Sequence, residues 1–170
     1  AIFYKNSQAG NEELVEQIEP FRDRLIPFAV INPTYADWEH DLTVCAEQYG
    51  ARGVRLYPHY HNYQLGDAHC RALVEAATAL GLVISLPIRQ IDQRQRHWLI
   101  EIPDLELGEI ATLVEAHPNA RFVLLEGSGY TASALGQAGN ELPANYLIEI
   151  SRLTAVIAAE IRVLMDNIGP

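Results

Sequence analysis

The chain has 170 residues, and its 22 acidic against 12 basic residues give a formal net charge of -10. Hydrophobic residues make up 49% and charged residues 20%, a balance typical of a globular domain long enough to bury a core. An acidic surface repels phosphate backbones, which argues against nucleic acid as a partner. No apolar run reaches the roughly 18 to 20 residues of a membrane span and no signal peptide is recognisable, so we expect no membrane partner.

Helix and strand patterns alternate along the chain. The first half predicts a helix from Asn11, with Leu14, Ile18 and Phe21 on one face, and then a buried strand over 25–33. A second helix follows, marked by Trp38, Leu42, Cys45 and Tyr49 and ended by Gly50, and then a strand over 53–58. Asp67 caps a third helix, whose apolar face consists of Cys70, Leu73, Val74, Ala77 and Leu80.

The second half predicts a strand over 82–88, a polar stretch over 89–98, a helix from about Asp104, strands over 121–127 and 145–153, and a last helix with Ile157, Ile161, Leu164 and Ile168 on one face. Cys45 and Cys70 both fall on apolar helix stripes. Cysteines in such positions are typical of buried thiols rather than of a disulfide, which favours a reducing compartment, and we predict a cytoplasmic protein.

Alternation at a spacing of roughly 25 to 30 residues is typical of right-handed βαβ units and a parallel sheet. Five strands by count alone suit an open doubly wound sheet of flavodoxin type. The chain, however, begins with a helix that lacks a preceding strand and ends after a helix. We therefore predict that 1–170 is a single domain and an incomplete portion of a (β/α)8 barrel. In either fold, ligands bind at the carboxyl ends of the strands.

Two histidines follow the strand over 53–58, in the sequence Tyr57-Pro-His59-Tyr-His61. If the chain stays extended after the proline, both histidine side chains lie on one side. One interpretation is a solvated or pocket-lining loop with tyrosines packed around it. The others are substrate contact, for which we name Tyr57, His59 and His61, and metal ligation, which is the least favoured.

The densest polar segment at a strand end is the stretch after the strand over 82–88. Arg89, Arg94 and Arg96 suit bidentate binding of a substrate carboxylate. Asp92 and His97 are candidates for acid-base catalysis. The alternative is a surface loop with internal Asp-Arg pairs, which contribute little when exposed. Trp98 favours the functional interpretation, because it predicts that the loop packs down.

Glu126 ends the strand over 121–127 and is followed by Gly-Ser-Gly. Its carboxylate is a candidate catalytic base, a candidate ligand, or the ion-pair partner of Arg89. The glycines alone are a weak phosphate signal, since neither of the common glycine-rich nucleotide motifs occurs. Glu149, Ser151 and Arg152, at the end of the following strand, are candidates of lower rank.

The order of these segments resembles the amidohydrolase superfamily, in particular its TIM-barrel group that includes decarboxylases of aromatic acids. The resemblance is carried by segments 11–33, 47–58, 79–88, 113–129, 145–153 and 164–170. It implies that the five strands are the third to seventh of eight. A metal-binding His-x-His would then precede residue 1, and a metal-binding aspartate would follow residue 170.

The resemblance also implies metal-binding histidines at the ends of two strands, where this chain has Arg89 and Glu126 instead. We therefore predict no metal ligand within the chain, and a divalent metal such as zinc only if its ligands lie outside it. The expected function is hydrolysis or decarboxylation of a small carboxylated or cyclic substrate, with a homo-oligomer as an open possibility. The alternatives are a metal-free barrel that binds a small molecule without catalysis, and a flavodoxin-like domain that binds a nucleotide or flavin.

Overall fold

The computed structural model describes residues 6–92, 94, 96–153 and 158–170. The chain divides into two compact units, Ala1–Ser85 and Leu86–Pro170. Among the described residues, no helix has the length and apolar character needed to cross a membrane.

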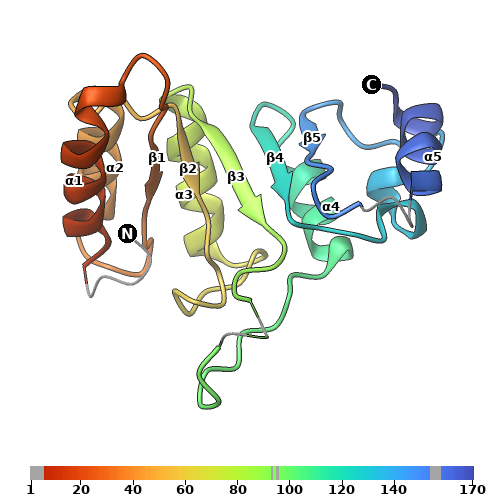
Figure 1. Ribbon diagram of the computed structural model, residues 1–170, viewed down its shortest axis with the longest axis horizontal. Helices are drawn as coiled ribbons and strands as arrows, with labels where there is room; N and C mark the ends of the chain where they lie inside the picture. Colours follow the sequence, from red (N-terminus) through yellow and green to blue (C-terminus); the bar gives the residue numbers. More distant parts are fainter. Residues whose placement is uncertain (1–5, 93, 95, 154–157) are drawn as a thin grey trace. The chain divides into compact units, whose positions relative to one another are not determined.

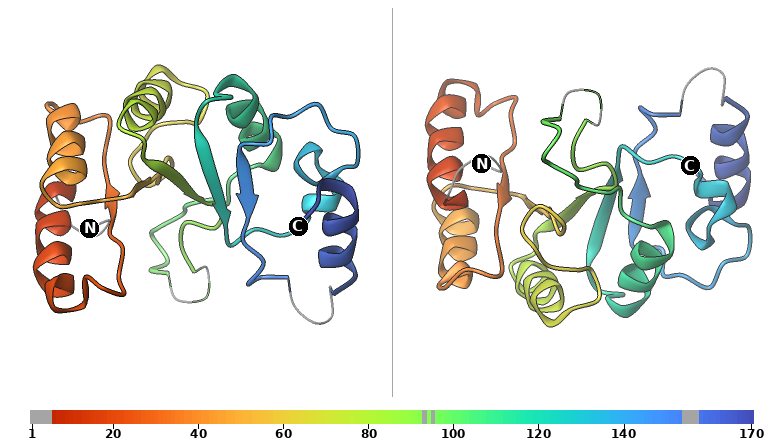
Figure 2. Two further views of the ribbon diagram at one scale, coloured as in Figure 1. Left: turned by 90° about the horizontal axis from the view of Figure 1, so that it is seen from above. Right: turned by 90° about the horizontal axis from the view of Figure 1, so that it is seen from below.

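The first unit is built from alternating helices and parallel strands. It contains α1 (Ser7–Ile18), the short 3-10 helix η1 (Glu19–Phe21), β1 (Phe28–Val30), α2 (Trp38–Glu47), β2 (Gly53–Arg55), α3 (Ala68–Ala79) and most of β3 (Val83–Pro87). The strands pair in chain order, with Ala29 opposite Val54 and Val54 opposite Ile84. The helices lie on one side of these strands (Figures 1 and 2).

This strand order decides between the two predicted folds. In a flavodoxin-type sheet the first strand lies between the second and the third, so the second and third strands are not neighbours. Here β2 pairs directly with β3. The open doubly wound alternative is therefore wrong, and the chain-order pairing of a barrel is the observed one.

The first helix begins earlier than its apolar pattern predicts. Asn6 caps α1 by accepting a hydrogen bond from the backbone N–H of Gln8 at 2.9 Å. Asn11, predicted as the start, is instead buried inside the helix. Its side chain donates to the carbonyl of Val30 at 2.9 Å and accepts from the N–H of Val30 at 3.0 Å, which fixes α1 to β1.

The strand predicted over 25–33 is shorter than its apolar run. Leu25 and Ile26 are 46% and 67% exposed, and regular pairing is limited to Phe28–Val30. Pro27 precedes this segment and has no N–H to donate to a neighbouring strand. Phe21, predicted on the buried face of the first helix, belongs to η1 and is 44% exposed. An apolar run thus marks the strand without fixing its length.

The third helix has its predicted cap and buried face, except that Leu80, predicted on that face, follows the last residue of α3 and is 36% exposed. Asp67 caps α3 by accepting a hydrogen bond from the N–H of Cys70 at 3.0 Å. The core of the first unit includes fully buried residues of α3, β2 and β3 and the residue directly after β2: Val54, Leu56, Cys70, Leu73, Val74, Ala77 and Ile84. Cys45 and Cys70 are both free and buried, as predicted, and burial raises the pKa of each thiol to about 12.

The second unit begins with the end of β3. It continues with α4 (Leu107–Ala116), β4 (Arg121–Leu125), the 3-10 helices η2 (Tyr130–Ala132) and η3 (Ala134–Gly136), β5 (Tyr146–Ile148) and α5 (Ala158–Ile168). β4 and β5 are parallel, with Phe122 opposite Tyr146. The N–H of Ile88, just after β3, donates to the carbonyl of Leu125 at 2.9 Å. The ends of β3 and β4 are therefore neighbours.

Both strands of this unit end before their predicted limits. β4 stops at Leu125 and β5 at Ile148, so Glu126 and residues 149–152 lie in the connections that follow. In α5, Leu164 is buried as predicted, but Ile168 is 37% exposed. Ile157, predicted on the same face, lies outside the described residues.

Replacing Asn11 with alanine tests the link between α1 and β1. The substitution leaves both the N–H and the carbonyl of Val30 without their side-chain partner, so we expect the free energy of unfolding to fall by about 2 kcal/mol or more. Urea denaturation measures this loss. The exposed Asn119→Ala provides the control, and an Asn11→Ala protein as stable as the control would contradict the assignment.

Candidate functional site

The histidine pair after β2 lies in a turn rather than in an extended segment. The N–H of His61 donates to the carbonyl of Tyr57 at 2.9 Å, that of Tyr63 donates to Pro58 at 3.0 Å, and Asn62 has φ 59°. The expectation of an extended chain is therefore wrong. His61 is buried, whereas His59 is only half-buried.

Three tyrosines surround the His61 ring, as the first interpretation of this loop proposed. Its centroid is 6.2 Å from that of Tyr57, 5.9 Å from Tyr60 and 6.5 Å from Tyr63. Burial lowers the pKa of His61 to about 4, against a smaller opposing effect of its hydrogen bond with the Ile31 backbone. His61 is therefore neutral at pH 7. Its position in the tyrosine cluster supports a packing role, and the predicted substrate contacts of Tyr57, His59 and His61 stay predictions.

The lowered pKa of His61 makes the stability of the protein depend on pH. The unfolded histidine binds a proton near pH 6.5 and the folded one only near pH 4, so stability is lost as the pH falls through this window. The loss reaches at most about 3 kcal/mol, because each pKa unit corresponds to about 1.4 kcal/mol.

Urea denaturation between pH 7 and pH 4 measures this loss. The difference between the wild type and His61→Phe isolates the histidine from carboxylates that titrate in the same range. The exposed His97→Gln should retain the wild-type slope. A His61→Phe protein with the wild-type slope would show that another group is responsible.

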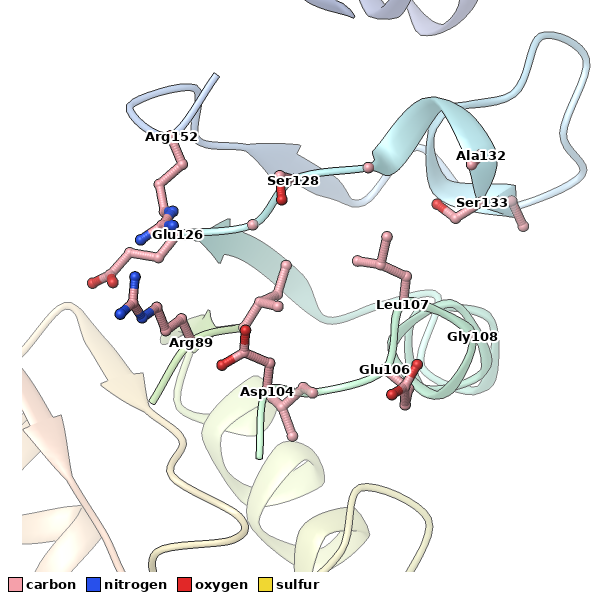
Figure 3. A pocket seen from close by; sticks show the side chains of 15 residues that line it. Arg89, Asp104, Glu106, Leu107, Gly108, Glu126, Ser128, Ala132, Ser133 and Arg152 are labelled. Atoms are coloured by element: carbon pink, nitrogen blue, oxygen red, sulfur yellow. The ribbon is translucent and has the colours of Figure 1, made fainter. Parts of the chain in front are cut away.

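A pocket of the second unit lies beside the ends of β3 and β4 and has a volume of about 570 Å³ (Figure 3). Its polar lining residues are Arg89, Asp104, Glu106, Glu126, Ser128, Ser133 and Arg152. The pocket therefore combines two arginines with three carboxylates at the carboxyl ends of parallel strands, where α/β proteins bind their ligands.

Arg89 is the most deeply placed charge of the pocket, with a side chain that is only 15% exposed. One terminal nitrogen of its guanidinium donates to Asp92 Oδ1 at 2.7 Å, and Nε donates to the carbonyl of Ile91 at 3.2 Å. Its ion pair is therefore with Asp92, not with Glu126 as expected. The partner lies three residues away because the chain turns back on itself immediately after β3.

Asp92 also binds Arg94. Its two carboxylate oxygens accept from Nε and from a terminal nitrogen of Arg94, at 3.1 and 2.9 Å. Hydrogen bonds from Arg94 hold the pKa of Asp92 well below its usual range. Asp92 is thus a poor proton donor at neutral pH. Its contacts favour an anchoring role for Arg89 over the predicted acid-base role.

In the same loop after β3, residues 97–100 are exposed. Trp98 is 79% exposed, so the expectation drawn from it is wrong. The His97 ring stacks on Trp98 with centroids 5.8 Å apart, and its Nδ1 accepts from the N–H of Leu99. Arg96 donates to the carbonyl of Ile100. These bonds are local, and the lining of the described pocket does not include Arg94, Arg96 or His97.

Glu126 leaves β4 with φ 55°, a left-handed conformation that costs a residue with a Cβ roughly 1 to 2 kcal/mol. Such strain at a strand end often marks a functional position, because the surroundings must enforce it. The side chains of Glu126, Arg89 and Arg152 point to the same side of the pocket (Figure 3). The geometry therefore places a carboxylate near two arginines.

Some pocket residues were given little or no weight by sequence reasoning. Arg152 was a candidate of lower rank at the end of the predicted strand over 145–153, and it lines the pocket. Asp104 and Glu106 suggested only a helix start, and α4 begins just after them at Leu107. The signal that could have found them is the acidic pair directly before an amphipathic helix, on the carboxyl side of a strand.

The described residues do not supply a metal site by themselves. Across residues 6–92, 94, 96–153 and 158–170, no group of three or more histidine, cysteine, aspartate or glutamate side chains could hold a metal ion. The end of β3 presents a guanidinium, which has no lone pair to offer a metal.

Parallel βα units with a polar pocket at the strand ends define an α/β protein of barrel type. The chain belongs to the amidohydrolase family, whose model matches residues 2–145. A search of curated proteins found no match.

Three decarboxylases of known structure share the fold. The enzyme acting on 2,6-dihydroxybenzoate from Rhizobium has 16% identity and a TM-score of 0.65, over 96% of this chain and 62% of that one. A 5-carboxyvanillate decarboxylase from Novosphingobium aromaticivorans, with bound manganese, has 13% identity and a TM-score of 0.66, and the match covers 96% of this chain and 57% of that one. The 5-carboxyvanillate decarboxylase from Sphingomonas paucimobilis has 16% identity and a TM-score of 0.63, and the match covers 99% of this chain and 62% of that one. The chain thus spans less than two thirds of each relative, and at these identities the likeness concerns the fold alone.

Two substitutions at position 126 measure the backbone strain directly. Glu126→Gly and Glu126→Ala remove the same carboxylate, but only glycine adopts a left-handed φ without steric cost. We expect the glycine variant to be more stable by about 1 kcal/mol, as measured by thermal or urea unfolding. The same pair of substitutions at the exposed helical position Glu115 should show the opposite order. A Glu126→Ala protein at least as stable as Glu126→Gly would contradict the strained conformation.

Proposed function

We propose that this protein acts on a small carboxylated aromatic or cyclic substrate by decarboxylation or hydrolysis. Membership of the amidohydrolase family supports an enzymatic role. The names of the structural relatives, which act on 2,6-dihydroxybenzoate and 5-carboxyvanillate, support the carboxylated aromatic class. The two buried thiols suit a reducing, cytoplasmic setting, and the net charge of -10 suits small-molecule rather than nucleic-acid partners. Whether the protein forms a homo-oligomer stays an open prediction.

The observation that carries the proposal is a largely buried arginine at the edge of a pocket that also holds a strained glutamate. A guanidinium presents five N–H donors, and the hydrogen bonds of Arg89 to Asp92 and Ile91 use Nε and one terminal nitrogen. Asp92 fixes the orientation of the fork, and a fork held in this way is suited to a planar carboxylate. Arg152, on the same side of the pocket, adds a second cation.

Glu126 is the candidate for proton transfer, since its carboxylate lies with the two arginines (Figure 3). In decarboxylation a proton must replace the departing carbon dioxide on the ring carbon, and in hydrolysis a base must activate water. Either task suits a carboxylate whose backbone is fixed at a strand end. In this proposal His97, Arg94 and Arg96 lie outside the lining of the pocket, and their predicted roles stay predictions.

Arg89→Lys tests the recognition of the carboxylate. Lysine keeps the positive charge but loses the planar fork, so we expect the Kd for 2,6-dihydroxybenzoate to rise at least tenfold in calorimetric titration. Arg162→Lys, an exposed substitution in the same unit, should leave the Kd unchanged. Equal affinity of the wild type and Arg89→Lys would refute the proposed carboxylate site.

Turnover separates the enzyme from the non-catalytic binding protein. Release of carbon dioxide by the wild type, lost in Glu126→Gln while the Kd changes little, supports catalysis. Tight binding of the probe without any product would favour the metal-free binding protein.

A further inference from the structure

Glu149, directly after β5, makes hydrogen bonds to two segments that form the pocket. Its Oε2 accepts from the backbone N–H of Glu126 at 3.3 Å and from the hydroxyl of Ser151 at 2.9 Å. Its Oε1 accepts from the backbone N–H of Ser151 at 2.5 Å. One bond therefore reaches across to the end of β4, and two close the turn that leads to Arg152.

The backbone of Glu149 is itself fixed by the strand ladder. Its N–H donates to the carbonyl of Leu124 at 2.9 Å, which continues the pairing of β5 with β4. The carboxylate therefore extends from a rigid point and holds the N–H of Glu126 at the residue where φ becomes 55°. A left-handed glutamate persists only when its surroundings over-determine it, and this hydrogen bond is one such constraint.

Glu149 acts as an ionised group. Burial tends to raise the pKa of its carboxyl, but the hydrogen bonds from Ser151 and from the N–H of Glu126 outweigh that effect and lower it. Hydrogen bonds to an ionised acceptor are stronger than those between neutral groups. Glu149 does not line the pocket, so it influences a ligand only through the groups that it holds.

We infer that Glu149 is the positioning residue of this site, since it sets the places of Glu126 and Arg152, two pocket groups of opposite charge. This inference rests on the proposed function, because the consequence is for a carboxylated ligand. With Glu149 in place, such a ligand meets a cation and a carboxylate in a fixed arrangement. Without it, the residue after β4 relaxes from its left-handed conformation, and the turn carrying Arg152 opens.

Two substitutions separate the bonds of Glu149. Glutamine has the same length but only one accepting oxygen, so it cannot accept from the N–H of Glu126 and from the N–H of Ser151 at once, and the bond that it keeps is to a neutral oxygen. Aspartate is one methylene shorter. It can still accept from the N–H two residues ahead, as in an Asx turn, but it no longer reaches Glu126. Glu141→Gln, an exposed change in the same unit, is the matched control.

The experiment compares binding of 2,6-dihydroxybenzoate with that of its neutral analogue 1,3-dihydroxybenzene. We expect Glu149→Gln and Glu149→Asp to raise the Kd for the carboxylated probe at least fivefold and the Kd for the neutral probe by less than twofold. General loosening of the fold would weaken both probes alike. In parallel, the amide resonance of Glu126 in a ¹H–¹⁵N spectrum should move upfield in both variants and stay in place in Glu141→Gln.

Each outcome decides the inference. Unchanged affinity for the carboxylated probe, or an equal loss for both probes, overturns it. If the wild type binds neither probe, the proposed function fails, and the amide resonance of Glu126 still tests the positioning: an unmoved resonance in the variants refutes it. Should Glu149→Gln fail to fold, Glu149→Asp, which keeps the local turn, gives the same comparison.

Discussion

Parallel strand pairing is the constraint on which the rest of this structure depends. A parallel strand can pair with the next one only after the chain has returned through a connection on one face, which here contains a helix in each described crossover of the first unit. Consequently the carboxyl ends of neighbouring strands lie together, and the residues that follow them meet. Ile88 bonds to Leu125, and Glu149 bonds to Leu124 and Glu126, because β3, β4 and β5 all end at the same edge of the second unit.

Two carboxylates at this edge are held in place by hydrogen bonds. Asp92 binds Arg89 and Arg94, while Glu149 binds Ser151 and the backbone of Glu126. In both cases hydrogen bonding to the ionised form lowers the pKa of the carboxyl. Fixed groups of opposite charge can select the orientation of a ligand as well as its net charge, and this is the physical basis of the carboxylated ligand proposed for this pocket.

The first unit follows the opposite principle at its strand ends. His61 is buried among tyrosines and is kept neutral, with its pKa lowered to about 4. Polar groups near strand ends are therefore accommodated in two ways. In the first unit a histidine is kept neutral, and in the second unit charged groups form ion pairs and hydrogen bonds. The difference follows from composition: three tyrosines surround the histidine, whereas arginines and carboxylates accumulate after β3, β4 and β5.

The sequence by itself determined the alternation of helices and strands, the cap at Asp67 and the burial of both cysteines, because these depend on periodicity and on local hydrogen bonding. The family was expected only from a resemblance in the order of the segments, and the family model over residues 2–145 shows it. It also singled out Arg89 and Glu126 as strand-end residues. Only the tertiary structure decided that Arg89 pairs with Asp92, that Trp98 is exposed, that Glu126 is left-handed and that Glu149 holds it. In the sequence, each strand-end arginine has several carboxylates that could be its ion-pair partner. Which one pairs with it depends on the direction that the backbone takes after the strand, and no residue pattern specifies that direction.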